Sequence, residues 1–200
     1  MNISTKLLST TLIAGVILAG CGGGSSNSKQ NTDNKEADSN IPYLQQNHAN
    51  YKLDGSNITP APVKDANKRS IDWTIEASDE EGAKKLAEHI RYMENQLLAD
   101  QNPRAFDKLF LMEAYMKFNK FYTTSVEQSG KSVVVSKIAN NRCAYRVIST
   151  HSDAVSNDFF AQGNISTDYS STADSILNSS DCNSQKTDIE SYIAQRKRRK

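Results

Sequence analysis

The first strongly periodic stretch of the chain runs from Ile71 to Ala77, where apolar and polar residues alternate. A period of two is typical of a β-strand with one buried face. Between Ser78 and Leu97 the apolar residues instead recur every three or four positions, which predicts an amphipathic helix. Ser78 and Glu81 have the spacing of a capping box, so we expect the helix to begin there.

A second helix is predicted from Asn102 to about Asn119. Asn102 suits the N-cap position and Pro103 the first helical position. Apolar side chains fall around most of the circumference of this helix, so we expect it to be the central core helix. The alternative is that part of it lies exposed and contacts a partner, but aromatic and methionine stripes are more often core.

Short apolar runs separated by turn signals follow the second helix. They predict a three-stranded antiparallel meander over residues 121–126, 132–138 and 142–150. The strand from Ile71 to Ala77 can join its edge. The predicted fold class is therefore α+β, with two helices packed on a small antiparallel meander sheet, one disulfide and a short C-terminal helix.

The chain from Ser152 to Ser184 is rich in Ser, Asn and Asp, and we expect a long loop there. Long loops inside a compact domain are often functional, so this segment is either a recognition surface or an inert loop. Thr187 and Glu190 form a second capping box, which predicts the short last helix. Residues 71–200 are expected to form one α+β domain.

A short apolar run, residues 7–18, follows Lys6 near the start of the chain and ends in Leu18-Ala19-Gly20-Cys21. The run is shorter than the roughly 20 apolar residues that cross a bilayer, which argues against an anchor helix. These features resemble the signal peptide and lipobox of bacterial lipoprotein precursors. The resemblance covers only these residues, and no family is recognised for the rest of the chain.

The lipoprotein resemblance implies that residues 1–20 are a signal peptide that is removed and that Cys21 is acylated. It places the protein in the cell envelope, anchored to a lipid bilayer. Gly22 fits an outer-membrane lipoprotein, because in Gram-negative cells Asp after the Cys is the usual signal for retention elsewhere. Residues 21–40 are polar and glycine-rich, so they are expected to be a flexible tether. Residues 41–70 are expected to wrap the domain as extended chain.

Charge is balanced along the chain, with 24 basic and 23 acidic side chains. The only strongly basic segment is the C-terminal run Arg196, Lys197, Arg198, Arg199 and Lys200. A body without a basic face does not indicate nucleic-acid binding. The basic run either stays solvated at a helix end or contacts anionic lipid head groups or acidic cell-wall polymer.

Besides Cys21, the chain contains Cys143 and Cys182. In an oxidising compartment two cysteines most simply form one disulfide. Two free thiols, or a bridge to another chain, are the alternatives. No zinc cluster is expected, because too few cysteines remain.

The sequence contains no catalytic motif that we recognise, so no catalytic residue, metal site or cofactor is predicted. His48, His89 and His151 lack paired metal-ligand spacing. The expected function is a non-enzymatic protein-interaction or assembly role in the envelope, with a protein partner there. The alternatives are a periplasmic inhibitor or immunity lipoprotein that blocks a toxin or lytic enzyme, and a cell-wall-acting enzyme. The enzyme would need a cleft holding a carboxylate with a raised pKa.

Overall fold

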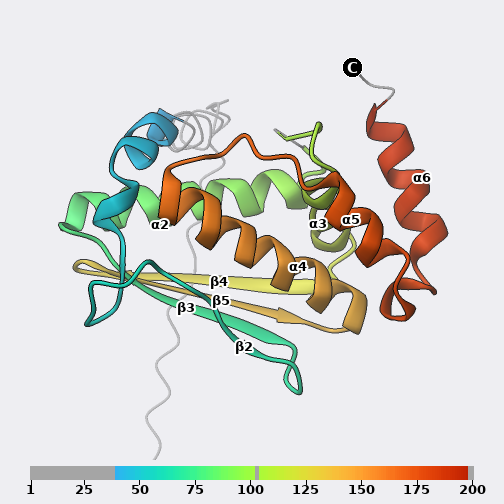
Figure 1. The fold of residues 1–200 in the computed structure, drawn as a ribbon, viewed down its shortest axis with the longest axis horizontal. Coiled ribbons are helices and arrows are strands. Elements are labelled where there is room, and N and C mark those ends of the chain that lie inside the picture. Colours follow the sequence, from blue (N-terminus) through green and yellow to red (C-terminus); the bar gives the residue numbers. More distant parts are fainter. Residues whose placement is uncertain (1–38, 102–103, 198–200) are drawn as a thin grey trace, which may run out of the picture.

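The computed structural model describes residues 39–101 and 104–197. An antiparallel sheet forms one layer, and the helices cover one of its faces (Figure 1). The strands lie in the order β1-β3-β5-β4, and β2 also pairs with β3. Their bounds are Lys52–Leu53 (β1), Val63–Asp65 (β2), Ser70–Glu76 (β3), Tyr122–Ser129 (β4) and Ser132–Ala139 (β5). This mixed α+β architecture confirms the predicted fold class.

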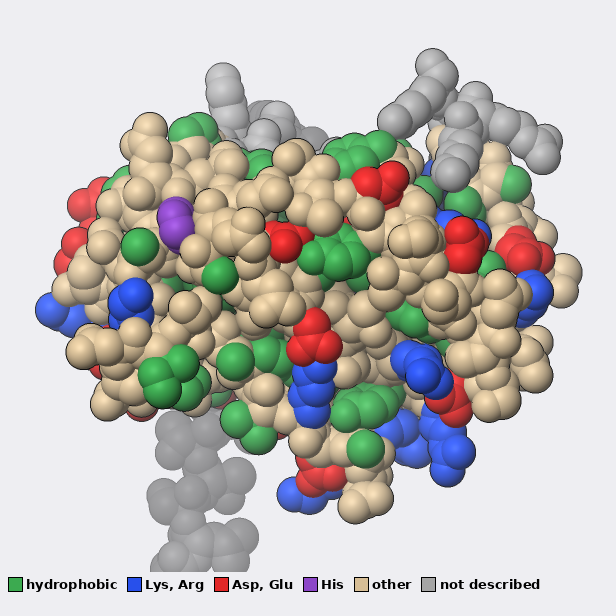
Figure 2. Space-filling model, in the orientation of Figure 1, with side chains coloured by type: hydrophobic (Ala, Val, Ile, Leu, Met, Phe, Trp, Pro, Cys, Tyr) green, Lys and Arg blue, Asp and Glu red, His purple; other side chains and the backbone are tan. Residues whose placement is uncertain are grey.

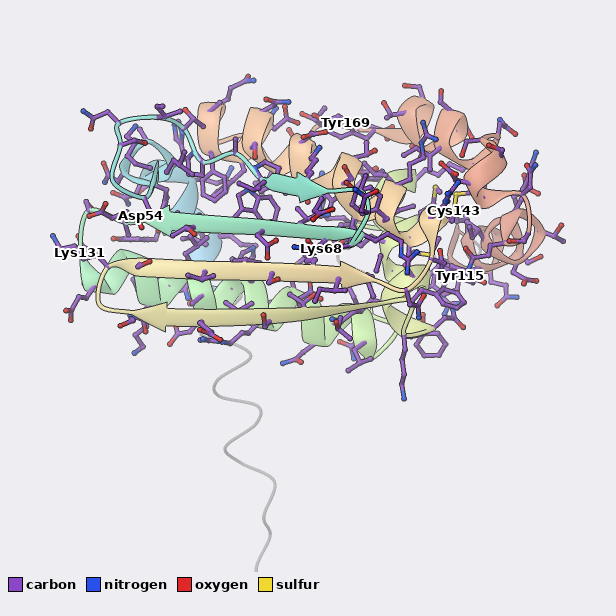
Figure 3. The ribbon with its side chains drawn as sticks, turned by 90° about the horizontal axis from the view of Figure 1, so that it is seen from below. Asp54, Lys68, Tyr115, Lys131, Cys143 and Tyr169 are labelled. Carbon is purple, nitrogen blue, oxygen red and sulfur yellow. A yellow bond between two sulfur atoms is a disulfide. The ribbon has the colours of Figure 1, made fainter. Side chains whose placement is uncertain are left out.

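The register of β3, β5 and β4 separates the two faces of the sheet. Ile71 pairs with Lys137 and Trp73 with Val135 across β3 and β5, so these residues share the inner face under the helices. No helix of the described residues covers the outer face: seen from that side, the strands lie in front of the helices (Figure 3). The strand predicted from Ile71 to Ala77 is therefore present and joins the sheet.

The two predicted helices exist, but they begin later than expected. Helix α2 (Glu80–Leu98) is capped by Asp79, whose carboxylate accepts from the backbone N–H of Gly82 at 2.7 Å. Helix α3 (Lys108–Phe118) is capped by the buried Asp107. Asp79 and Asp107, rather than Ser78 and Asn102, thus start the helices; Asn102 and Pro103 lie outside the described residues.

Helix α3 is the central helix, as its apolar circumference predicted. Every residue from Leu109 to Met116 is buried, and Glu113 is among them. The helix packs against the other helices and, through Glu113, against the sheet. The exposed apolar side chains of this region are Phe106 and Phe118 at its two ends.

The prediction of a third meander strand is wrong. Residues 142–150 belong to helix α4 (Arg142–Ala154), which Asn141 caps by accepting from the backbone N–H of Ala144 at 2.8 Å. Buried residues come in pairs four positions apart, Cys143 with Ala144 and Val147 with Ile148. That spacing fits a helix face and not the alternation of a strand.

The expected long loop between Ser152 and Ser184 is also mostly helical. Helix α4 continues into a π-helical segment, η2 (Val155–Phe160), and is followed by α5 (Ser170–Leu177) and a 3-10 turn, η3 (Ser180–Cys182). The scattered apolar residues that looked isolated in the sequence are buried: Phe160 is 5 % exposed and Leu177 is 2 % exposed. Their burial supplies the energy that orders this polar segment.

Residues 41–70 are not uniformly extended. Residues 39–46 are helical. Leu44 is buried, and the hydroxyl of Tyr51 donates to the carbonyl oxygen of Gly82 at 3.1 Å. These contacts place the segment beside α2. A short 3-10 turn, η1 (His48–Asn50), follows the helix.

Cys143 and Cys182 form the predicted disulfide, which joins the start of α4 to η3. The predicted last helix is present as α6 (Lys186–Lys197), with Ile189, Tyr192 and Ile193 buried. Both parts pack on α3 at the end of the molecule shown at the right in Figure 1. Helix α6 begins before Thr187, so Thr187 is a helical residue and not the predicted cap.

Removing this disulfide should lower stability substantially. The bridge closes a loop of 39 residues, which corresponds to about 4 kcal/mol in the chain-entropy model. We therefore expect the double variant Cys143→Ala/Cys182→Ala to lose about that much free energy of unfolding in urea titrations. Reductant should destabilise the parent protein and leave the double variant unchanged; equal midpoints for the oxidised and reduced parent would contradict the bridge.

Candidate functional site

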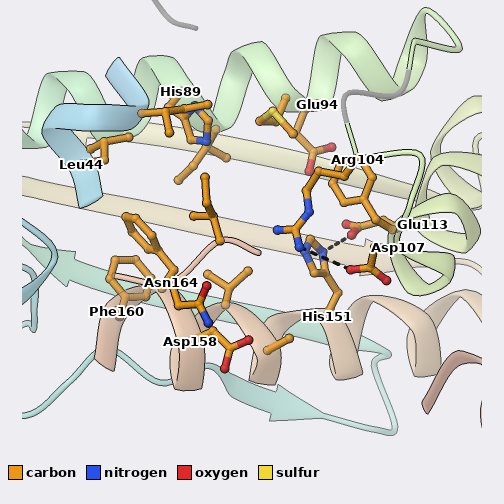
Figure 4. Close-up of a pocket in the computed structure, with 18 of the residues that line it drawn as sticks. Leu44, His89, Glu94, Arg104, Asp107, Glu113, His151, Asp158, Phe160 and Asn164 are labelled. Atoms are coloured by element: carbon orange, nitrogen blue, oxygen red, sulfur yellow. Dashed lines mark hydrogen bonds and ion pairs between the residues drawn. The ribbon is translucent and has the colours of Figure 1, made fainter. Parts of the chain in front are cut away.

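A cavity of about 450 Å³ lies between the helices and the inner face of the sheet (Figure 4). The sheet forms its floor, α2 forms one wall, and α4 with η2 forms the opposite wall. Pockets that bind small molecules have volumes of about 300–1,000 Å³. The volume therefore suits one small organic molecule.

Most of the cavity wall is apolar. The floor is made by Trp73, Ile75 and Val135. The remaining apolar lining comes from the helices and the segments beside them: Ile41, Leu44, Leu86, Ile90, Met93, Leu97, Phe106, Phe110, Ala154, Val155, Phe159, Phe160 and Ile165. The indole N–H of Trp73 is buried, and no acceptor for it is present in the described part of the chain.

One end of the cavity holds a buried carboxylate, Glu113, in the middle of α3. Its Oε1 accepts from the ammonium of Lys137 at 2.7 Å and from the hydroxyl of Tyr122 at 3.1 Å. Its Oε2 forms an ion pair with Nδ1 of His151, drawn as a dashed line in Figure 4. Glu113 therefore ties α3 to β4, β5 and α4.

A second carboxylate, Glu94 of α2, completes the charged cluster. Its Oε1 lies 2.8 Å from the ammonium of Lys137, and its Oε2 lies 2.6 Å from the ammonium of Lys117. The hydroxyl of Thr124 donates to the same Oε2 at 2.8 Å. We call Glu94, Glu113, Lys117, Lys137 and His151 the buried charge cluster.

The cluster stabilises the charged forms of its members. Burial would raise the pKa of Glu113, but the charges of His151 and Lys137 hold that pKa far below its ordinary value. Burial likewise opposes the charged form of Lys137, but Glu113 and Glu94 raise the pKa of this ammonium. The pKa of Glu94 is also lowered, because Lys137 and Lys117 outweigh its burial and the repulsion from Glu113.

A second polar group, Arg104 with Asp107, lies at the same end of the cavity as Glu113 and His151 (Figure 4). Arg104 Nη2 lies 3.5 Å from Oδ2 of Asp107 and donates to the carbonyl oxygen of Thr167 at 3.1 Å. The carboxylate of Asp158, in η2, accepts from the hydroxyl of Tyr169 at 2.8 Å. Figure 4 shows Arg104 and Asp158 from different elements facing the cavity.

The segment after η2, residues 163–169, contributes the last part of the lining and runs across the helix layer on the side away from the sheet (Figure 1). Gln45 donates to the carbonyl oxygen of Gly163 at 3.0 Å, and Arg104 holds Thr167. Gly163 has φ of +66°, and a Cβ here would lie 2.7 Å from His48. A side chain at position 163 would therefore push this roof segment away from residues 39–50.

The residues predicted from the sequence as functional lie elsewhere. Cys21, Arg198, Arg199 and Lys200 are outside the described residues. Lys197 ends α6, and Arg196 forms an ion pair with Asp100 while its guanidinium lies 3.9 Å from the Tyr192 ring centroid. Arg196 thus stabilises the end of α6, and its contact with an anionic surface stays a prediction.

The sequence gives no sign that any of the three histidines is functional. In the structure His151 belongs to the buried charge cluster and His89 lines the cavity. Glu113 could have indicated a buried polar site, because it is a carboxylate flanked by Met112 and Ala114 in a helix that is apolar on nearly all sides. Lys137 gives a similar signal, because it occupies an inward position of β5 after Val133 and Val135.

Charged side chains of both signs are interspersed over the face seen in Figure 2. Within residues 39–101 and 104–197, no group of three or more His, Cys, Asp or Glu side chains could hold a metal ion. In the same ranges no helix is both long and apolar enough to cross a bilayer.

Comparison with known proteins gives no relative: no protein-family model, curated protein or solved structure matches this chain significantly.

Replacing Glu113 by Gln should destabilise the protein strongly. Removing one partner of a buried ion pair costs about 3–5 kcal/mol, because the other charges stay buried without compensation. We expect Glu113→Gln to lower the free energy of unfolding by that amount. Glu81→Gln, at the surface ion pair with Lys85 on α2, is the matched control and should change it by less than about 1 kcal/mol. Equal effects of the two changes would contradict the role of the cluster.

The cluster also predicts how stability depends on pH. Because the folded-state pKa of Glu113 is lowered, its contribution is present above the unfolded-state pKa of about 4.3 and is lost as the pH falls below it. The raised pKa of Lys137 has the opposite sign: its contribution is present below about pH 10.4 and is lost as the pH rises through the folded-state pKa. Urea unfolding from pH 2 to 11 should show the onset of both losses, and Glu113→Gln should flatten the dependence on the acid side.

Proposed function

We propose that this chain is a non-enzymatic binding protein of the cell envelope, anchored by lipid at Cys21, that holds a small and mainly apolar molecule in its cavity. The observation that carries the proposal is the cavity of about 450 Å³ between α2, α4 and the sheet. The envelope location and the lipid anchor come from the lipobox resemblance alone.

The lining of the cavity favours an apolar occupant. Most of the wall is apolar, so water inside the cavity can make few hydrogen bonds with the protein. An apolar molecule that displaces this water removes apolar surface from solvent, at roughly 25 cal/mol per Å².

Trp73 supports the same proposal with a different kind of observation. Its side chain is 6 % exposed, and its buried indole N–H has no acceptor among the described residues. Buried donors are nearly always paired, because an unpaired one loses the hydrogen bond it made with water. Since Trp73 lines the cavity, a molecule held there could supply the acceptor.

The buried charge cluster argues for binding rather than acid catalysis. A cell-wall-acting enzyme was expected to need a carboxylate with a raised pKa, but Glu94 and Glu113 both have lowered pKa values. Each is engaged by at least two donors. A protein partner in the envelope, in an assembly or as the target of an inhibitor, stays a prediction and is compatible with ligand binding.

Trp73 is the only tryptophan of the chain and lines the cavity, so its fluorescence should report binding directly. The sample is residues 21–200 with Cys21→Ser, because an acyl chain attached at Cys21 could compete with the ligand for the cavity. We expect decan-1-ol to change the Trp73 fluorescence of this sample saturably. Ala154→Phe should weaken binding by more than about tenfold, because Ala154 lines the cavity and the ring would fill it.

The matched control for this experiment is Ala161→Phe, which adds the same ring at an exposed helical position outside the cavity lining. It should bind decan-1-ol like the parent. Thermal unfolding should show a cooperative transition for both variants, which checks that they are folded. No saturable signal with the parent, or equal binding by both variants, would show that the cavity is not a binding site.

A further inference from the structure

The charged side chains that line the cavity differ in how they are compensated. Lys137 contacts both Glu94 and Glu113, and His151 also contacts Glu113. Arg104 contacts Asp107. Among the described residues, Asp158 is the cavity-lining carboxylate that forms no ion pair, whereas Glu94, Asp107 and Glu113 each have one.

Asp158 is held in a defined position. It lies in η2, and π-helical segments are rare and often occur at functional sites. Its Oδ2 accepts from the hydroxyl of Tyr169 at 2.8 Å. Burial, followed by the hydrogen bond and charge of Asp158, raises the pKa of Tyr169 to about 12. Tyr169 therefore keeps its proton at neutral pH, and Asp158 acts only as an acceptor towards it.

Aromatic rings line the same cavity. Phe159 and Phe160 follow Asp158 directly and pack edge to face, with ring centroids 5.0 Å apart. Tyr169 bonds to Asp158, and Trp73 lies on the floor. The faces of aromatic rings attract cations, and the attraction grows when water is excluded.

We propose that the cavity selects an organic cation: a molecule whose ammonium group pairs with Asp158 and whose apolar body lies along the cavity floor. An acceptor atom on the same molecule can take the indole N–H of Trp73. This inference rests on the proposed function, because it names the chemical class of the ligand for the same cavity. It assigns Asp158 as the residue that sets the preference for positive charge.

The remaining charges disfavour an anion in the same place. An anionic ligand would approach Asp158 without a neutralising partner and would have to compete with Glu94, Glu113 and Asp107 for the cations of the lining. A neutral ligand would leave Asp158 without a counter-charge. A cation avoids both costs.

The test compares three ligands of equal length: decylamine, decan-1-ol and decanoate, each titrated into residues 21–200 with Cys21→Ser at pH 7 and followed by Trp73 fluorescence. We expect decylamine to bind roughly tenfold or more tighter than decan-1-ol, and decanoate to bind weakest, because only the ammonium group can form an ion pair with Asp158 in addition to a hydrogen bond.

Asp158→Asn keeps the shape and the acceptor for Tyr169 but removes the charge. It should reduce the decylamine affinity to that of decan-1-ol and leave the decan-1-ol affinity unchanged. The matched control is Glu190→Gln, which removes one negative charge from an exposed position of α6. It should preserve the full preference for decylamine.

The outcomes separate this inference from the proposed function. If decan-1-ol binds in the cavity but decylamine binds no tighter, or if Asp158→Asn keeps the preference, the cation inference is overturned and the binding function stands. Tightest binding of decanoate also overturns it. If none of the three ligands binds, the proposed function fails as well.

Discussion

The contact between Glu113 and Lys137 is the interaction on which the arrangement of the helices over the sheet depends. It joins the middle of the central helix to the inner face of β5 at 2.7 Å, in the interior of the protein. Glu94 extends the contact to α2, and His151 extends it to α4. Apolar packing can slide by small amounts, but hydrogen-bonded charges hold a direction as well as a distance. The cluster therefore fixes three helices relative to the strands.

This constraint explains how the fold can contain a cavity. The two walls, α2 and α4, are both tied to Glu113 and Lys137 at one end of the cavity. Beyond that point they run on either side of the floor made by Trp73 and Val135 (Figure 4). A purely apolar core could relax inward and close such a space. The ion pairs hold α2 and α4 to the strands at the charged end of the cavity and so oppose such a collapse there.

Sequence patterns predicted the elements whose period was clear. The alternation from Ile71 to Ala77, the stripe of α2 and the apolar circumference of α3 all correspond to observed elements. Residues 142–150 were misread because Tyr145 and Val147 suited a strand, whereas burial follows the pairs Cys143–Ala144 and Val147–Ile148. In the sequence Asn141 is equally suited to a turn and to a helix cap, and in the structure it caps α4. Local preference alone could not decide between the two.

The cavity could not be predicted, because its lining comes from segments that are far apart in the sequence. The role of each charged residue there depends on which other charge it contacts, and the sequence does not show these pairs. A lone Glu113 or Lys137 in an apolar pattern indicates a buried charge but not which one compensates it. Asp158, in contrast, gives no signal in the sequence, because it is one of several acidic residues in a polar stretch. It reaches the cavity wall because α4 continues into η2. Helix α4 is fixed at its start by the disulfide and further along by the contact of His151 with Glu113. At the end of η2 a third contact holds the segment: Nδ1 of His48 lies 3.1 Å from the carbonyl oxygen of Phe160. The position of this unpaired charge is therefore determined by contacts along the whole helix.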